Sequence, residues 1–148
     1  MGSEVREESP LARIDACLLS ERPAHALTGL RADGTLDELL PEVVALIGFH
    51  EGYEVHHKDL WAHTLQVVEK CSPDADLRWV ALMHDTGKVS TRERDAQGRV
   101  TFWRHEAESG ACFERAAQRL GMPAPRRERI AFVITQHGRF NAYRPSWS

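Results

Sequence analysis

The sequence has few cysteines and no long apolar run, and these two absences exclude whole classes of protein. Its three cysteines are scattered and show no Cys-x-x-Cys spacing: Cys17, Cys71 and Cys112. This pattern indicates neither a disulfide framework nor a structural zinc knuckle. No segment approaches the roughly 18 to 20 apolar residues that cross a bilayer, and the acidic start MGSEVREESP lacks the regions of a signal peptide. We therefore expect a protein of the reducing cytoplasm with no membrane partner.

Aromatic residues are also scarce, at 7 %, whereas 42 % of the 148 residues are hydrophobic and 28 % are charged. This profile is typical of one soluble globular domain with a real core. The net charge of −3 conceals an asymmetry, because residues 1–50 carry −5, residues 51–98 carry −3 and residues 99–148 carry +5. All nine basic residues in the last segment are arginine. Arginine suits phosphate, so the asymmetry favours a phosphorylated or nucleic-acid ligand, although a solvated basic face would give the same bias.

Apolar residues recur at helical spacing along nearly the whole chain, which predicts an all-α fold with short loops. The predicted helices span residues 11–20, 23–31, 36–47 with a break at Pro41, 59–71, 76–84, 105–120 and 125–137. Gly87, Gly121 and Gly138 are the expected stop signals for three of the last four. Residues 89–103 are expected to form a charged loop with a small hairpin around Gly98.

The last four predicted helices each place one histidine on their inward, apolar face: His63, His84, His105 and His137. A lone histidine on such a face is more often a hydrogen-bonded core residue than a ligand. Four buried imidazoles, however, would need four separate sets of partners, whereas one metal site satisfies them jointly. Asp85 directly follows His84. One cation can hold both only where the helix loses its regularity, and we expect the backbone freedom of Gly87 to supply that departure.

Four segments of the chain resemble the HD-domain metal-dependent phosphohydrolase superfamily: HHKDLWAHTLQVV, LRWVALMHDTGKVSTR, GRVTFWRHEAESGA and RIAFVITQHGRF. Within it, they are most similar to the HD segment of bacterial tRNA nucleotidyltransferases and poly(A) polymerases. The resemblance implies an HD-domain helical bundle in residues 51–148, preceded by a helical connector in residues 1–50.

The resemblance also implies a ligand set. It makes His63, His84 and Asp85 ligands of a divalent metal, and it matches His105 and His137 to positions that hold a second metal in the dinuclear members. Nitrogen-rich ligation favours one or two transition-metal ions (Mn, Fe, Co, Ni or Zn) over magnesium.

Two features depart from that family. Its signature closes with a further aspartate on a later helix, but no acidic residue follows Glu128, and Asn141 is the nearest oxygen-bearing substitute. The last ligand is therefore expected to be missing, replaced or beyond residue 148. By comparison with the family, the expected domain of residues 51–148 is short of its last helix. Nothing in the sequence resembles a nucleotidyltransferase head with its glycine-rich strand and paired carboxylates, so this chain alone should not add nucleotides to RNA.

These residues predict a metal-dependent phosphohydrolase that uses metal-activated hydroxide on a nucleotide or RNA-end phosphoester, either a phosphomonoester or a 2′,3′-cyclic phosphate. Asp85 is the expected bridging carboxylate, and Lys88 would neutralise charge on the transferring phosphoryl group. Arg104 and Arg139 are candidates to bind substrate oxygens, and solvated surface arginines are an equal alternative. An exposed Trp103 could stack a nucleobase.

The alternative prediction is a non-catalytic RNA-positioning or structural HD module that works with a separate nucleotidyltransferase-type or kinase-type partner. A purely structural metal is a third reading. Lys88 and the complete histidine set favour the enzyme, because an RNA-binding surface needs no inward-facing ligands. His56 and His57 are minor candidates for substrate contact and otherwise cap or pack the helix that follows.

Overall fold

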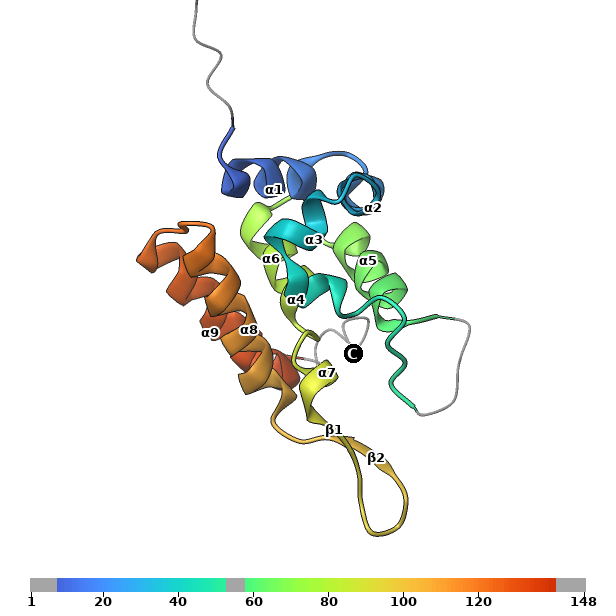
Figure 1. Ribbon diagram of the computed structural model, residues 1–148. Coiled ribbons are helices and arrows are strands. Elements are labelled where there is room, and N and C mark those ends of the chain that lie inside the picture. Colours follow the sequence, from blue (N-terminus) through green and yellow to red (C-terminus); the bar gives the residue numbers. More distant parts are fainter. Residues whose placement is uncertain (1–7, 53–57, 141–148) are drawn as a thin grey trace, which may run out of the picture.

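The computed structural model describes residues 8–52 and 58–140, and within these ranges the chain is folded almost entirely into helices (Figure 1). The elements follow in the order α1 (Pro10–Leu19), α2 (Pro23–Ala32), α3 (Thr35–Leu39), α4 (Pro41–Val44), α5 (Leu60–Lys70), α6 (Ala75–Met83), α7 (Lys88–Thr91), β1 (Arg92–Arg94), β2 (Val100–Phe102), α8 (His105–Arg119) and α9 (Ala124–Phe140). The all-α prediction is confirmed. No helix in these ranges has the length and apolar character needed to cross a membrane.

Polar side chains fix where several helices begin. The Ser9 hydroxyl accepts a hydrogen bond from the Ala12 N–H at 3.1 Å, and Pro10 occupies the first position of α1. Asp59 and Asp74 cap α5 and α6 in the same way, each accepting from the N–H three residues further on. Such caps satisfy N–H groups that a helix start leaves unpaired. The two helices that lead into the histidine cluster therefore start at defined residues.

The charged loop predicted for residues 89–103 is more ordered than expected. Its hairpin is confirmed, because β1 and β2 pair antiparallel with Arg92 opposite Phe102, and Gly98 in the turn has a φ of 80°. Residues 88–91, however, form the short helix α7. The predicted stop at Gly138 is wrong, since α9 continues to Phe140. Glycine weakens a helix, but it ends one reliably only in the left-handed conformation, which Gly121 adopts after α8.

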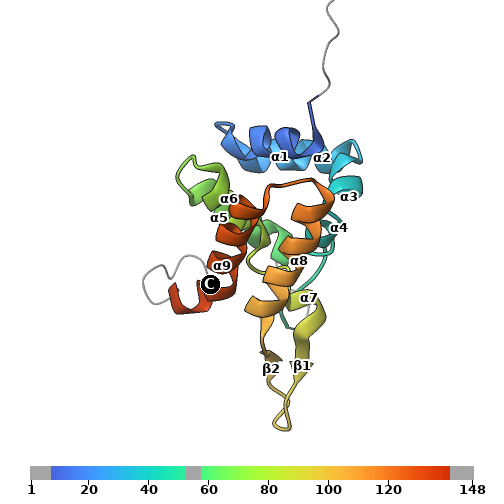
Figure 2. The same cartoon turned by 90° about the vertical axis from the view of Figure 1, so that its left-hand side faces the viewer.

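Helix α6 lies at the centre of the fold and packs against α1, α5, α8 and α9. Helices α1 and α2 lie at one end of the molecule and the hairpin projects at the other, as the two views show (Figures 1 and 2). Helices α8 and α9 pack side by side along their length. Trp79 of α6 is fully buried, and its ring meets Phe113 of α8 edge to face. Residues at the C-terminal end of α6 are therefore enclosed by the rest of the chain.

Two arginine networks, one buried and one partly exposed, hold α1 and α9 against α6. The guanidinium of Arg78, only 5 % exposed, donates to the backbone carbonyls of Leu18, Ser20 and Cys71. Arg126 of α9 pairs with Asp15 at 2.8 Å and with Asp76 at 2.7 Å. These contacts fix α1 and α9 against the N-terminal half of α6, and the candidate ligands follow the opposite end of this helix.

Candidate metal centre

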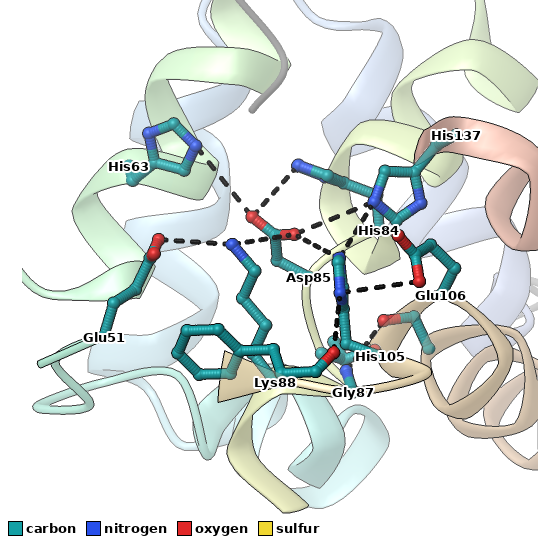
Figure 3. Close-up of polar contacts among 12 residues, drawn as sticks. Glu51, His63, His84, Asp85, Gly87, Lys88, His105, Glu106 and His137 are labelled. Atoms are coloured by element: carbon teal, nitrogen blue, oxygen red, sulfur yellow. Dashed lines mark hydrogen bonds and ion pairs between the residues drawn. The ribbon is translucent and has the colours of Figure 1, made fainter. Parts of the chain in front are cut away.

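Asp85 is the centre of a cluster of four histidines just beyond the C-terminal end of α6 (Figure 3). Its carboxylate is 3 % exposed. The histidines come from four different elements: His63 from α5, His84 from the C-cap of α6, His105 from the first position of α8 and His137 from α9. The structure thus brings together all five residues that the sequence singles out as metal ligands.

The two oxygens of Asp85 face different pairs of histidines. Oδ2 lies 3.9 Å from Nε2 of His63 and 3.2 Å from Nε2 of His84. Oδ1 lies 3.7 Å from Nε2 of His105 and 4.0 Å from Nε2 of His137. These contacts define two groups of three residues: one contains His63, His84 and Asp85, and the other contains Asp85, His105 and His137. Within each group the ligand atoms all lie within 4.8 Å of one another. Each group could hold one metal ion, and the Asp85 carboxylate belongs to both.

Backbone carbonyls determine which nitrogen of three histidines carries the proton. In each ring Nδ1 lies near the carbonyl oxygen three residues earlier, at 2.7 Å for His84, 3.3 Å for His105 and 2.6 Å for His137. A carbonyl oxygen only accepts hydrogen bonds, so we assign the proton to Nδ1. Each neutral ring then directs its Nε2 lone pair at the cluster. This arrangement is usual for metal-binding histidines, whose second nitrogen is held by a hydrogen bond.

The assigned tautomers place acceptors against acceptors. Nε2 of His105 lies 3.3 Å from Nε2 of His137. In addition, Nε2 of His63 and Oδ2 of Asp85 are buried and have no hydrogen-bond partner within residues 8–52 and 58–140. Buried lone pairs that face one another are unfavourable unless a cation lies between them. The residues therefore fit a divalent metal ion by their chemistry as well as by their spacing.

The electrostatics of the cluster favour the ligand forms of these side chains. Burial lowers the pKa of His63 and of His137, and it outweighs the opposing effect of the Asp85 charge. Burial alone would raise the pKa of Asp85, but positive charge close to the carboxylate, including the Lys88 ammonium, outweighs it and holds that pKa well below its usual range. A neutral imidazole and an ionised carboxylate are the forms that bind metals.

Lys88 places a cation beside the cluster. Its ammonium nitrogen lies 3.6 Å from Oδ1 of Asp85 and 3.3 Å from Oε1 of Glu51, and 5.3 Å from the centroid of the Phe102 ring. Sequence reasoning missed Glu51, because it lies 37 residues before Lys88 and belongs to no recognisable motif. Arg92 fixes the segment around Glu51, since its guanidinium lies 4.6 Å from the Phe49 ring centroid and donates to a backbone carbonyl of the same segment.

Gly87 is required by close packing rather than by backbone freedom, which corrects the sequence-based expectation. Its φ of −70° is ordinary for any residue. A Cβ at this position would instead overlap the carbonyl oxygen of His105 and would lie 2.5 Å from the backbone nitrogen of Ser109. The N–H of Gly87 donates to the Ser109 hydroxyl at 2.8 Å. Gly87 therefore lets the chain after Asp85 approach the start of α8, where His105 lies.

The remaining sequence candidates lie at the edge of the cluster or outside the part that the structure describes. Arg104 precedes His105 in an exposed turn, and Trp103 beside it is 79 % exposed. Arg139 belongs to α9, but its side chain lies outside the described residues. His56, His57 and Asn141 also lie outside them.

The chain is similar to part of several curated proteins. It is 42 % identical over 140 residues to a CC-adding tRNA nucleotidyltransferase of Thermus thermophilus, which covers 90 % of this chain and 31 % of the relative. It is 33 % identical over 130 residues to an A-adding tRNA nucleotidyltransferase of Deinococcus radiodurans, covering 84 % of the chain and 30 % of the relative. A multifunctional CCA protein of Azoarcus sp. is 33 % identical over 125 residues, with 82 % and 30 % covered.

These similarities concern one portion of longer proteins. The chain spans about a third of the length of the curated relatives it matches. No protein-family model matches it, and no solved structure does. Over most of its length the chain is thus homologous to part of the tRNA nucleotidyltransferase and CCA proteins, and its buried His/Asp cluster is consistent with an HD segment.

Proposed function

We propose that this chain is a metal-dependent phosphohydrolase that acts on a nucleotide or an RNA-end phosphoester, either a phosphomonoester or a 2′,3′-cyclic phosphate. The observation that carries the proposal is that ring nitrogens face one another beside Asp85, with Nε2 of His105 3.3 Å from Nε2 of His137. Nε2 of His63 and Oδ2 of Asp85 are also buried with no hydrogen-bond partner among the described residues. A cluster built only for packing would place a donor against each acceptor. This one leaves the acceptors facing a common space.

The two groups around Asp85 would hold one or two divalent ions. His63 and His84 would bind on the Oδ2 side, and His105 and His137 on the Oδ1 side. The nitrogen-rich donor set favours manganese, iron, cobalt, nickel or zinc over magnesium. When bound, such an ion lowers the pKa of a coordinated water and polarises a phosphoryl oxygen.

The side chains around the ligands would orient the substrate and balance its charge. The Lys88 ammonium, directed at the cluster, would stabilise negative charge on a phosphoryl oxygen or on the leaving oxygen. Glu51 holds this ammonium from the opposite side, which keeps it at the edge of the cluster. The carbonyl contacts at Nδ1 hold the rings of His84 and His137 in their ligand orientation. Arg104 and Arg139 remain proposed phosphate contacts.

The similarity to tRNA nucleotidyltransferases supports an RNA-related substrate, and with it a cytoplasmic location. The same similarity favours one second candidate, a non-catalytic module that positions RNA for a separate nucleotidyltransferase-type or kinase-type partner, because the relatives are named as nucleotidyltransferases and not as hydrolases. The two proposals differ in hydrolysis and agree on RNA-related binding.

The test combines metal analysis with hydrolysis assays on phosphomonoester, phosphodiester and 2′,3′-cyclic nucleotide substrates. We expect the reconstituted chain to retain metal and to hydrolyse at least one class. Asp85→Asn keeps the shape of the side chain but removes the charge shared by both groups, so it should lose both properties. Asp37→Asn is the matched control, since Asp37 is exposed and pairs with Arg31 at 3.3 Å on the surface.

Three outcomes separate the candidates. Retained metal with hydrolysis that depends on Asp85 supports the phosphohydrolase. Retained metal without hydrolysis of any substrate class would instead support the non-catalytic module. Less than about 0.2 ion per chain after reconstitution, with no hydrolysis in any divalent ion, would refute the metal centre itself.

A further inference from the structure

Trp103 is an exposed indole that the packing of the fold does not explain. It is 79 % exposed, the largest fraction among the large hydrophobic side chains that the structure describes. It lies in the turn between β2 and α8, and the buried core is formed by other residues. An exposed indole gains none of the free energy that its burial would give. A molecule that binds on Trp103 would supply that burial.

The turn that carries Trp103 is held in an unusual backbone conformation. Arg104 has a φ of 62°, and no other residue except glycine has a positive φ within the described ranges. Left-handed backbone is uncommon for a long side chain, and such outliers concentrate at ligand sites. The Arg104 side chain forms no hydrogen bond or ion pair with any described residue and does not cap α8. Its guanidinium is therefore available to a ligand.

A hollow of about 490 Å³ lies at this turn, and its lining is suited to a planar ligand that carries a phosphate. The lining residues are Thr101, Phe102, Trp103, Arg104 and Glu106. Its volume is in the usual range for small-molecule sites. The one acid among them, Glu106, lies 3.6 Å from Nδ1 of His105. The hollow thus offers an aromatic face together with a guanidinium that has no ion-pair partner among the described residues.

The hollow adjoins the proposed metal centre, because its lining residues are close in sequence to His105 and contact two residues of that centre. Trp103 is two residues before His105, so their Cα atoms are at most about 7 Å apart. The Phe102 carbonyl oxygen contacts Nδ1 of His105 at 3.3 Å, and the Phe102 ring lies beneath the Lys88 ammonium. A molecule bound in the hollow would therefore lie about the length of one nucleotide from the His/Asp cluster.

From this geometry we infer that the hollow binds an unpaired nucleobase, stacked on Trp103, of a substrate whose phosphate lies toward Arg104 and the cluster. The inference rests on the proposed function and names its substrate class. Aromatic stacking accepts any base, because every base has a π-face. The same chemistry could come from a free mononucleotide or from the single-stranded end of an RNA, and the two sources are separated by the test.

The test measures binding of two probes to the 148-residue chain, with a chelator present so that hydrolysis cannot consume them. The probes are adenosine 5′-monophosphate and a single-stranded hexaribonucleotide with a fluorescent label. Trp103→Ala should weaken binding about 5- to 150-fold, the range expected for loss of one base stack. Trp103→Phe keeps an aromatic face and should retain most of the affinity. Phe132→Ala is the matched control, since Phe132 is 64 % exposed on α9 and does not line the hollow.

The pattern of binding decides the matter. Loss with both probes assigns the hollow to a mononucleotide-sized ligand, and loss with the hexaribonucleotide alone assigns it to an RNA end; either supports the inference. Unchanged binding to Trp103→Ala, or no binding of either probe to the natural sequence, overturns it. Quenching of tryptophan fluorescence by the probes should disappear in Trp103→Ala and remain in Phe132→Ala, which a structural role for Trp103 would not produce.

A second measurement separates this inference from the proposed function. If the metal-loaded chain hydrolyses adenosine 5′-monophosphate and ribose 5-phosphate, Trp103→Ala should lower kcat/KM for the first and leave the second unchanged. Equal losses would refute base binding while the phosphohydrolase stands. Binding that depends on Trp103 without any hydrolysis would refute the enzyme while the base site stands.

Discussion

Gly87 lies against the backbone at the start of α8, so adding a methyl group there should destabilise the protein. The same methyl group added at Gly29 should stabilise it. Gly87→Ala places a Cβ against the backbone at the start of α8, overlapping the His105 carbonyl oxygen and lying 2.5 Å from the Ser109 nitrogen. Gly29→Ala adds the same methyl in the interior of α2, where nothing lies within 4 Å of the new atom. Both variants carry the same substitution, glycine to alanine, and differ only in the atoms that surround it.

The expected magnitudes follow from these surroundings. Overpacking costs about 1 to 3 kcal/mol, and Gly87→Ala should lie in the upper part because backbone atoms cannot rotate away. For a chain of this size, that corresponds to a Tm lowered by roughly 5 to 10 °C. Gly29→Ala should stabilise the protein by about 0.5 to 1 kcal/mol, since alanine is the better helix former. Its Tm should therefore rise by roughly 2 to 3 °C.

The cluster supplies a second readout. To accommodate the methyl at Gly87, α8 must shift, and His105 must shift with it relative to Asp85. Because the position of a ligand depends on its supporting contacts, the affinity for manganese should fall about 10-fold or more. Thermal unfolding by circular dichroism and metal titration by calorimetry measure the two effects. If Gly87→Ala kept the original Tm and metal affinity, the close approach of α7 to α8 would be wrong.

Two further predictions concern stability. Arg78→Met removes a buried guanidinium that donates to three backbone carbonyls, and it should cost about 2 to 4 kcal/mol in urea unfolding; a loss below about 0.5 kcal/mol would contradict the network. The metal-free chain should also lose stability as the pH falls from 7.5 to 5.5. The pKa values of His63 and His137 are lower in the folded state than the ordinary 6.5, so the unfolded chain binds more protons in this range. Stability that rises on acidification would show that these rings are protonated in the folded chain.

The helices could be predicted because apolar periodicity and capping residues are local signals. Asp59 and the sequence around Pro41 marked real boundaries, and the break at Pro41 separates α3 from α4. Helix α7 was missed, because four residues are too few to show a 3.6-residue period. The error at Gly138 arose because helix propensity is a weak preference, which the surrounding structure can override.

The candidate site could be predicted in its members but not in its geometry. His84 and Asp85 are adjacent and directly follow an apolar segment, so the sequence indicates them as candidate ligands. Glu51 shows no such signal, since its contact with Lys88 depends on how the hairpin and the preceding segment fold together. The reason for Gly87 was also hidden, because its neighbour Ser109 is 22 residues away and only the packing of α8 brings it close.

The arrangement of the histidines indicates whether folding or metal binding bears the unfavourable free energy of bringing their lone pairs together. The carbonyl contacts of His84 and His137 form within single helices, so these rings take their ligand orientation as the helices fold. The packing of α6, α8 and α9 then forces the lone pairs together. That cost is borne by folding and not by metal binding, which leaves the site preorganised. A cation that binds only the folded chain would relieve it and stabilise the fold by about 2.7 kcal/mol at a concentration 100 times its Kd.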